Sequence, residues 1–494
     1  MIRRRTGRRI VAGTICRRSP RAGVWIASAL GLLAAVPAAA APAAGTLTPV
    51  EAYRMALART PVMTEARARI AEAHGAVREA KGNLLPKLGL SFAASGSDNP
   101  LNVFGMKLQQ RSATFNDFGA GSFLQGIQSG NASAVLFSAP DELNRPGFYT
   151  NYQTKLQLTI PIYNGGLIWG GLRRARAMAA AARRGERMAG QKLLFEVIGR
   201  YEGLRTADAY VGVAGQAIRA ARSYRELSRK LFRHGVVAKT DVLRAQVQLG
   251  TARLGLMRAQ KQRALAGEGL RILIGRPEGR ALRLAPGVVT IDVPREALGR
   301  LKADAETANP GLRALDAQVR AARAGVHQAR AAYLPHFNLM LAREWNDRTV
   351  ALSHPSYTVA GVLNWDVLDF GARRGALDRA QARVIRKRAA LQQARDGIRL
   401  QIEQAWQDAR LAAARIQVKA AAVTAAAETA RLEKLRYEQG VSIFTQLLSA
   451  QAELDQARAD RVAARYQETM ARAALLLALG RLTPAAVQLT AHQP

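Results

Sequence analysis

The sequence predicts a mixed α/β membrane protein in which short paired strands lead into very long helices. Residues Tyr152 to Ile162 alternate between the two faces of a strand, and one of those faces is apolar. After Asn164-Gly165-Gly166 the pattern becomes helical, and the same order of strand, glycine turn and helix recurs 205 residues later, with Gly371 at the turn. The third observation is that the two runs that follow these turns are each just under 70 residues long and contain no proline.

Residues 1–44 are predicted to be a secretory signal peptide that is removed. Eight arginines and no acidic residue precede Glu51, an apolar run extends from Val24 to Ala35, and the alanines after Pro37 suit cleavage. The apolar run is too short for a membrane anchor. Because the only cysteine is Cys16, the mature chain would contain no disulfide, thiolate metal site or lipid anchor.

The rest of the chain is predicted to be a duplication. Thr60-Pro61 recurs as Asn309-Pro310, 249 residues later, whereas beyond the strands Gly235 recurs as Gly440 at an offset of 205. The first copy therefore holds 44 additional residues before Tyr152. We expect repeats at 45–275 and 301–482, a joining segment at 276–300 and a tail at 483–494.

Each repeat is expected to contribute two strands to a membrane-spanning sheet. The first strand of each pair is predicted around Leu88 to Ala94 and Phe337 to Leu341, and the second from Tyr152 and from Tyr357 to Val367. About ten residues suffice to cross a bilayer at a tilt. Four strands cannot satisfy their own edges in lipid, so other copies must close the sheet, to eight strands in a dimer or twelve in a trimer. Hairpins covered by a soluble core are the alternative.

The segment from Asp98 to Asn151 is rich in glycine, serine and asparagine. Polar loops of small residues suit the extracellular end of a barrel. We therefore expect a solvated loop there.

The long helices are predicted from Gly166 to Arg233 and from Gly371 to Tyr437, about 100 Å each at 1.5 Å per residue. The second shows a seam of the coiled-coil type, spaced by threes and fours. Its residues are Ile398, Ile402, Ala405, Ala409, Ala413, Ile416, Ala420, Val423, Ala427 and Ala430. Most are alanine, which buries little area, so many helices packed side by side in a cylinder would fit better than an isolated pair.

Each long helix is expected to fold back at a glycine turn, with Thr240 as N-cap of the following helix in the first copy. The turns are unusually apolar for exposed segments, which indicates a docking surface; packing within an oligomer is the alternative. The residues of this predicted surface are Gly235, Val236, Val237, Gly440, Val441, Ile443 and Phe444.

Composition and motifs argue against two other classes of function. The net charge of +37, or +29 without the leader arginines, comes from 61 arginines spread along the chain, without base-stacking or zinc-finger motifs, so no nucleic-acid partner is expected. The six histidines lack metal-ligand spacing, and no phosphate-binding loop or nucleophile motif occurs. We expect no enzyme activity, cofactor or metal.

The order of these features resembles the TolC family of outer-membrane efflux proteins. The resemblance covers Glu51 to about Leu482 and is carried by the duplicated Leu-Pro, the strand ends PIYNGG and DVLDFG, the tips RHGVVAKTDVL and EQGVSIFTQLL, and the closing IGR and LGR. It implies a homotrimer in the outer membrane of a Gram-negative bacterium, with a twelve-stranded transmembrane barrel continuous with a periplasmic tunnel of coiled-coil helices. It also implies a passive conduit for efflux or type I secretion that docks a periplasmic adaptor protein and, through it, an inner-membrane pump. Residues 277–300 and the tail would form a belt around the tunnel.

The resemblance is weakest at the gate. Family members close the tip with aspartates and an arginine in the second copy, where this chain has Gln446, Ser449 and Ser442. Asp241 and Arg244 remain in the first copy. These five residues are the candidate constriction, and we expect it to be looser than a charged gate or held by different bonds.

Two rival interpretations remain. A periplasmic adaptor also has a helical hairpin, but inserted once within small β-domains. A basic coiled-coil structural protein would lack the strands.

Overall fold

The computed structural model describes residues 46–490 except 132, 134–135, 138, 277–281 and 295. The chain falls into two units, Met1–Ala43 and Ala44–Pro494. The predicted signal peptide lies outside the described residues, and so do residues 491–494 of the predicted tail.

Helix lengths repeat between the two halves of this unit, as the duplicated motifs predict. The pairs are α1 (Pro49–Arg59) and α9 (Leu298–Ala308), with 11 residues each; α2 (Pro61–Gly82) and α10 (Pro310–Ala331), with 22; α7 (Leu167–Arg233) and α11 (Ala372–Glu438), with 67; and α8 (Lys239–Leu273) and α12 (Phe444–Ala478), with 35. The first two pairs keep the offset of 249 residues and the last two the offset of 205.

The four predicted strands form one antiparallel sheet in the order β1-β2-β4-β5. Their bounds are Lys87–Ser97, Tyr149–Tyr163, His336–Asp347 and Pro355–Asn364. The strand predicted to reach Val367 ends three residues earlier. There the indole N–H of Trp365 donates to the backbone carbonyl of Tyr333 (3.2 Å), which holds the chain beside the end of α10.

The segment after β1 is more ordered than the predicted solvated loop. It contains α3 (Pro100–Gln109), the short 3-10 helix η1 (Phe115–Phe118), α4 (Ala120–Gln128) and α6 (Asp141–Asn144). The side chain of Asn99 caps α3, and the Phe104 and Phe118 rings pack edge to face with centroids 4.8 Å apart. Local caps and aromatic contacts therefore organise this glycine-rich segment.

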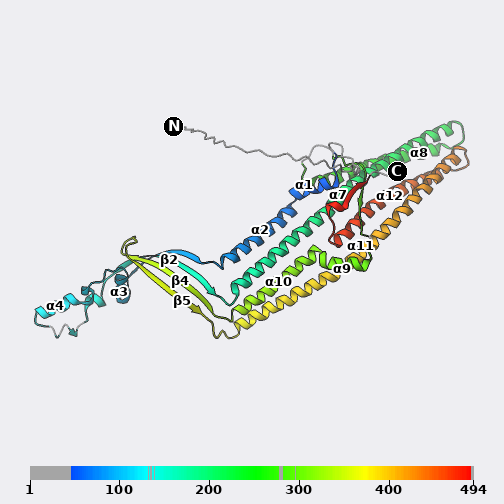
Figure 1. The fold of residues 1–494 in the computed structure, drawn as a ribbon. Helices are drawn as coiled ribbons and strands as arrows, with labels where there is room; N and C mark the ends of the chain where they lie inside the picture. Colours follow the sequence, from blue (N-terminus) through cyan, green and yellow to red (C-terminus); the bar gives the residue numbers. More distant parts are fainter. Residues whose placement is uncertain are drawn as a thin grey trace, which may run out of the picture. The chain divides into compact units, whose positions relative to one another are not determined.

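The helices next to the sheet form a layer in the order α2, α7, α10, α11 (Figure 1). Each leads into or follows one strand, so the order of helices matches the order β1-β2-β4-β5. Farther from the sheet, α7 packs on α8 and α12, and α11 packs on α12. All ten predicted seam residues of α11 are buried or half-buried, which confirms that seam.

The largest apolar core lies where these two sets of helices meet. It includes the fully buried side chains of Tyr201 on α7 and Ile402 on α11. Beside it, β3 (Val288–Ile291) pairs antiparallel with β6 (Val487–Thr490). The joining segment and the tail, distant in sequence, thus meet in one two-stranded sheet.

Among the described residues, none of the helices combines the length and the apolar character that a membrane-spanning helix needs.

Candidate functional site: an open sheet and a helical tip

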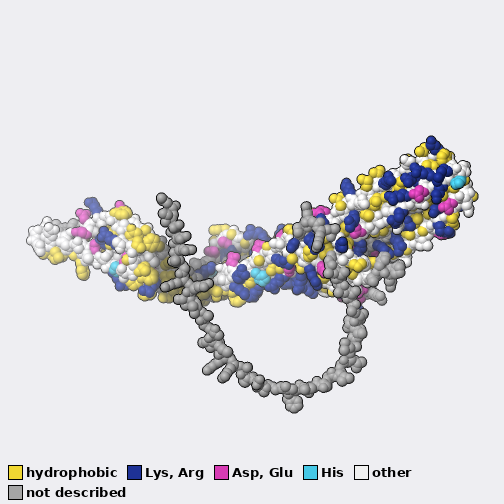
Figure 2. All heavy atoms as spheres, turned by 90° about the horizontal axis from the view of Figure 1, so that it is seen from above, with side chains coloured by type: hydrophobic (Ala, Val, Ile, Leu, Met, Phe, Trp, Pro, Cys, Tyr) yellow, Lys and Arg dark blue, Asp and Glu magenta, His cyan; other side chains and the backbone are white. Residues whose placement is uncertain are grey.

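The four-stranded sheet is open at both edges. Within the described residues, β1 pairs only with β2, and β5 pairs only with β4. Its apolar side chains face outward: Leu90 is 73% exposed and Val359 72%. Hydrophobic side chains gather over these strands in Figure 2. An unpaired, apolar sheet of this kind would be an aggregation hazard in water.

The predicted strand-to-helix turns lie where the glycines place them. Gly165 and Gly166 have φ of +58° and +88°, and Gly371 has φ of +97°, a region that favours glycine. At Gly165 a Cβ would also lie 2.8 Å from the carbonyl oxygen of Ala331, so α7 and the end of α10 approach closely there.

At the opposite end the two helix hairpins turn at Gly235 and Gly440, with φ of +74° and +73°. Each turn closes by a backbone hydrogen bond from the following residue, Val236 to Leu231 and Val441 to Arg436, both 2.9 Å. These are the glycine-based helix ends that the sequence predicts. The prediction that Thr240 is the N-cap of the following helix is wrong. Ala238 occupies that position, and Thr240 lies inside α8 (Lys239–Leu273).

The turns touch each other and leave an apolar rim. A Cβ on Gly440 would be 3.2 Å from a methyl group of Val236. Val236, Val441 and Ile443 are 50%, 68% and 64% exposed, and Val237 is half-buried. Phe444 contradicts its predicted place on the docking surface: it is 1% exposed, because its ring packs on Tyr437 at 5.4 Å between centroids.

Two buried polar contacts hold the hairpins together, and sequence reasoning missed both. The hydroxyls of Ser228 on α7 and Tyr437 on α11 are 3.2 Å apart, and the Tyr224 hydroxyl donates to the amide oxygen of Gln451 on α12 (2.7 Å). A signal was available, because Tyr437 lies seven residues beyond Ala430 and so continues the seam of α11.

Burial raises the pKa of both phenols and so extends the pH range over which they stay neutral. It raises the pKa of Tyr224 to about 12, helped by the charge of Asp455, and it raises the pKa of Tyr437, helped by the charge of Asp241. The pKa of the Asp455 carboxyl is also raised by burial. The joint between the hairpins is therefore made of uncharged hydrogen bonds at neutral pH.

The five candidate constriction residues lie at the tip: Asp241 and Arg244 near the start of α8, Ser442 in the second turn, and Gln446 and Ser449 near the start of α12. The buried Ser442 hydroxyl donates to Glu433 (2.8 Å) and lies 2.6 Å from the amide oxygen of Gln446. Gln446, Ser449 and Arg244 are exposed. Within the described chain, Asp241 and Arg244 form no ion pair with each other or with another residue. Glu433, which pairs with Arg436 at 2.8 Å, is the charged group that sequence reasoning overlooked.

Comparisons with known proteins agree with this architecture. Residues 52–276 and 301–481 match the family described as outer membrane efflux protein. Protein CyaE of Bordetella pertussis is 32% identical over 326 residues, which cover 65% of this chain and 69% of that protein.

Solved structures share the fold at low identity. A crystal structure of CusC has a TM-score of 0.73 at 16% identity and covers 90% of this chain and 95% of its own. The outer membrane protein VceC of Vibrio cholerae has a TM-score of 0.70 at 17% identity and covers 87% and 96%. The MtrE channel of Neisseria gonorrhoeae, in an open state, has 0.68 at 18% and covers 87% and 88%.

The two matched segments correspond closely to the two predicted repeats, and neither rival interpretation explains them. The chain therefore belongs to the outer membrane efflux protein family, whose members are outer-membrane channels for efflux or secretion.

Proposed function

We propose that this channel works as a homotrimer, in which three four-stranded sheets close into a twelve-stranded barrel in the outer membrane. The barrel continues into a tunnel of helices that crosses the periplasm. The two unpaired sheet edges carry the proposal, because in lipid each exposed N–H and C=O must find a partner. A barrel of twelve strands also encloses a wider space than one of eight strands, in which side chains fill the interior.

The helical tips would dock the other components of a tripartite efflux or type I secretion assembly. Val236, Val441 and Ile443 give an apolar rim on a scaffold fixed by two glycine turns. A periplasmic adaptor protein is the partner that this rim would bind, and an inner-membrane pump would be joined through the adaptor. The pump supplies the energy, and this chain supplies a passive path.

The tip would also be the gate. Opening requires two arrangements that are close in energy. The Ser228–Tyr437 and Tyr224–Gln451 contacts link the two hairpins by neutral hydrogen bonds, each with a net value of about 1 kcal/mol. A joint of that strength holds the closed state and is within reach of adaptor binding.

The test uses outer membranes from cells that express the full chain. Unheated samples are expected to migrate as a detergent-resistant trimer, and the purified protein is expected to form pores in planar lipid bilayers. A monomer that stays soluble without detergent and forms no pores would overturn the proposal.

A further inference from the structure

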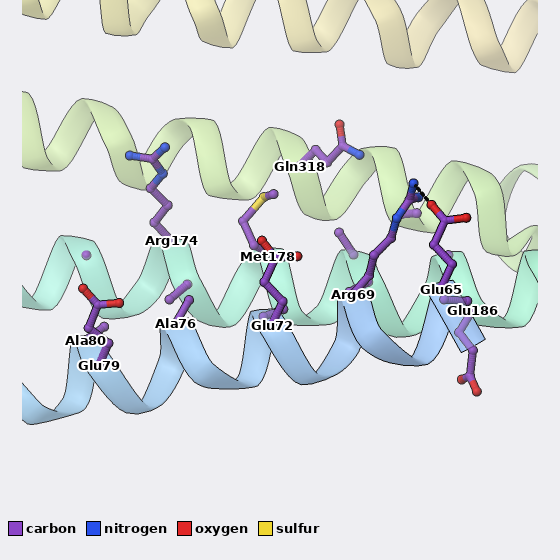
Figure 3. Close-up of a pocket in the computed structure, with 18 of the residues that line it drawn as sticks. Glu65, Arg69, Glu72, Ala76, Glu79, Ala80, Arg174, Met178, Glu186 and Gln318 are labelled. Carbon is purple, nitrogen blue, oxygen red and sulfur yellow. Dashed lines mark hydrogen bonds and ion pairs between the residues drawn. The ribbon is translucent and has the colours of Figure 1, made fainter. Parts of the chain in front are cut away.

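The two outer helices of the layer differ in the charges that they present on one face: α2 presents three glutamates and Arg69, whereas the charged side chains of α11 there are all basic. A groove of about 800 Å³ is lined by α2, α7 and α10, and includes Glu72 and Glu79 of α2 (Figure 3). A neighbouring groove shares Arg174, Met178 and Gln318, and its far wall is α11, with Arg379, Arg383, Arg386 and Lys387. Because the shared residues lie in both grooves, the acidic and basic stripes lie on the same side of the layer.

The helix edges beside these stripes are built for close approach. On α2, a Cβ on Gly75 or Gly82 would meet no atom within 4 Å, and the same holds for Gly375 and Gly397 on α11. Near the sheet, among the described residues, α2 packs on α7 and α11 packs on α10, and each helix leaves its other edge uncovered; farther from the sheet α11 also packs on α9 and α12 (Figure 1). Small residues on an uncovered helix edge allow a further helix to pack at short distance.

The charges on these edges are unused within one copy. Glu72, Glu79, Arg379 and Arg386 are exposed, and none of them has an ion-pair partner among the described residues. Glu65, which continues the acidic stripe, is instead held by Arg69 at 2.5 Å. Residues 72 and 79 are seven apart, as are 379 and 386, so each pair lies on one helix face.

The internal duplication supplies the register in which the edges would meet. The joint between the two repeats within one chain is the packing of α7 on α10, where a Cβ on Gly170 would lie 2.8 Å from Cγ of Gln328. Adding the offset of 205 to Gly170 gives Gly375 on α11, and subtracting the offset of 249 from Gln328 gives Glu79 on α2. The equivalent contact between copies would therefore place Gly375 of one copy opposite Glu79 of the next. The contact of Gly311 with Met188 likewise becomes Val62 opposite Gln393.

In this antiparallel register Glu72 lies opposite residues 382–383. Arg379 and Arg386 then lie one helical turn to either side of it, and Arg379 also lies between Glu79 and Glu72. Opposite charges one turn apart are within reach of each other. The four side chains would alternate in sign along the joint, as Glu79, Arg379, Glu72 and Arg386.

We propose that these four residues form a charged clasp between copies, in which Glu72 and Glu79 on α2 of one copy pair with Arg379 and Arg386 on α11 of the next. The proposal rests on the proposed ring of copies and names the residues that set its register. The joint is head to tail, because the acidic and basic edges are different surfaces. The clasp favours contact of α2 in one copy with α11 in the next. It disfavours contact between two α2 edges or two α11 edges, because like charges repel.

Cysteine cross-linking tests the register. The full chain with Glu79→Cys and Gly375→Cys is oxidised in outer membranes, and a ladder of linked dimers and trimers is expected on denaturing gels. Cys16, in the predicted leader, is the only natural cysteine, and the single variants control for it. The matched control is Glu79→Cys with Gly397→Cys, which moves the thiol by 22 residues, about 33 Å along the same helix. Equal linking in both pairs, or none at residue 375, would overturn the clasp.

Charge reversal tests the pairing. E72K/E79K and R379E/R386E are each expected to lower the temperature at which the oligomer dissociates in detergent, and the fourfold swap is expected to restore it. If the oligomer of the fourfold variant dissociates at a temperature no higher than that of either double variant, the pairing is ruled out.

The unmodified chain separates this idea from the proposed function. If it forms trimeric pores while linking at residue 375 and charge rescue both fail, the clasp is wrong and the channel stands. If it forms neither oligomer nor pore, both proposals fail.

Discussion

Replacing Tyr437 by phenylalanine removes one oxygen atom from the joint between the hairpins and leaves the packed ring in place. The Ser228 hydroxyl, 0% exposed, then loses its partner 3.2 Å away. A buried neutral hydrogen bond contributes about 1 kcal/mol. If three copies open together, the closed state loses about 3 kcal/mol, which shifts the balance between closed and open channels roughly 150-fold.

The assay is single-channel recording in planar bilayers, where the open fraction of Tyr437→Phe is expected to rise steeply. Tyr466→Phe is the matched control, because the Tyr466 hydroxyl has no hydrogen-bond partner in the described part of the chain and lies on α12, away from the turns. Ser228→Ala should act like Tyr437→Phe, and the double variant should add little, as expected for two halves of one contact. An open fraction of Tyr437→Phe equal to that of Tyr466→Phe would refute this account of the gate.

Three further predictions concern the turns and the tip. Gly165→Ala should lower the melting temperature measured by circular dichroism more than Gly371→Ala does. Both residues have positive φ, but only at residue 165 would the new Cβ meet a carbonyl oxygen, at 2.8 Å. Equal decreases in melting temperature would exclude a contribution from that clash. Ile443→Asp should abolish capture of the adaptor protein while conductance stays native, because residue 443 is 64% exposed and outside the buried joint; unchanged capture would remove it from the docking rim. The pKa of Tyr224 is about 12 in the folded tip and near 10 when unfolded. The neutral phenol therefore contributes its full stabilisation below pH 10, and this stabilisation is lost as the pH rises through 12. Tip opening, followed by hydrogen exchange and conductance, should therefore increase over that range, and Tyr224→Phe should flatten the dependence; an identical dependence in that variant would assign the titration elsewhere.

The sequence was sufficient for the parts of the fold that depend on local pattern. Proline-free length predicted the 67-residue helices, and spacing by threes and fours predicted a seam that is covered at every position. The shift of offset from 249 to 205 located the additional segment in the first copy. Within that segment α4 escaped prediction because it has only nine residues, with glycines and no side-chain cap.

The tip was harder to predict because its contacts join residues far apart in the chain. Ser228 and Tyr437 are 209 positions apart, and no local pattern pairs them. Phe444 was misplaced for a different reason. The backbone at Ile443 is extended (φ −85°, ψ 152°), so exposure alternates from Val441 to Phe444, whereas an apolar turn was expected to be exposed throughout.

The equal helix counts on either side of the largest core have a mechanical consequence. Near the sheet each copy contributes α2, α7, α10 and α11, and near the tip it contributes α7, α8, α11 and α12, so four helices per copy run at both levels. In the proposed trimer the wall would thus contain twelve helices near the sheet and twelve near the tip. Because the number of helices is the same at both ends, the tunnel can narrow only where its helices lean inward. A transported molecule would meet its narrowest passage at the end where they do so.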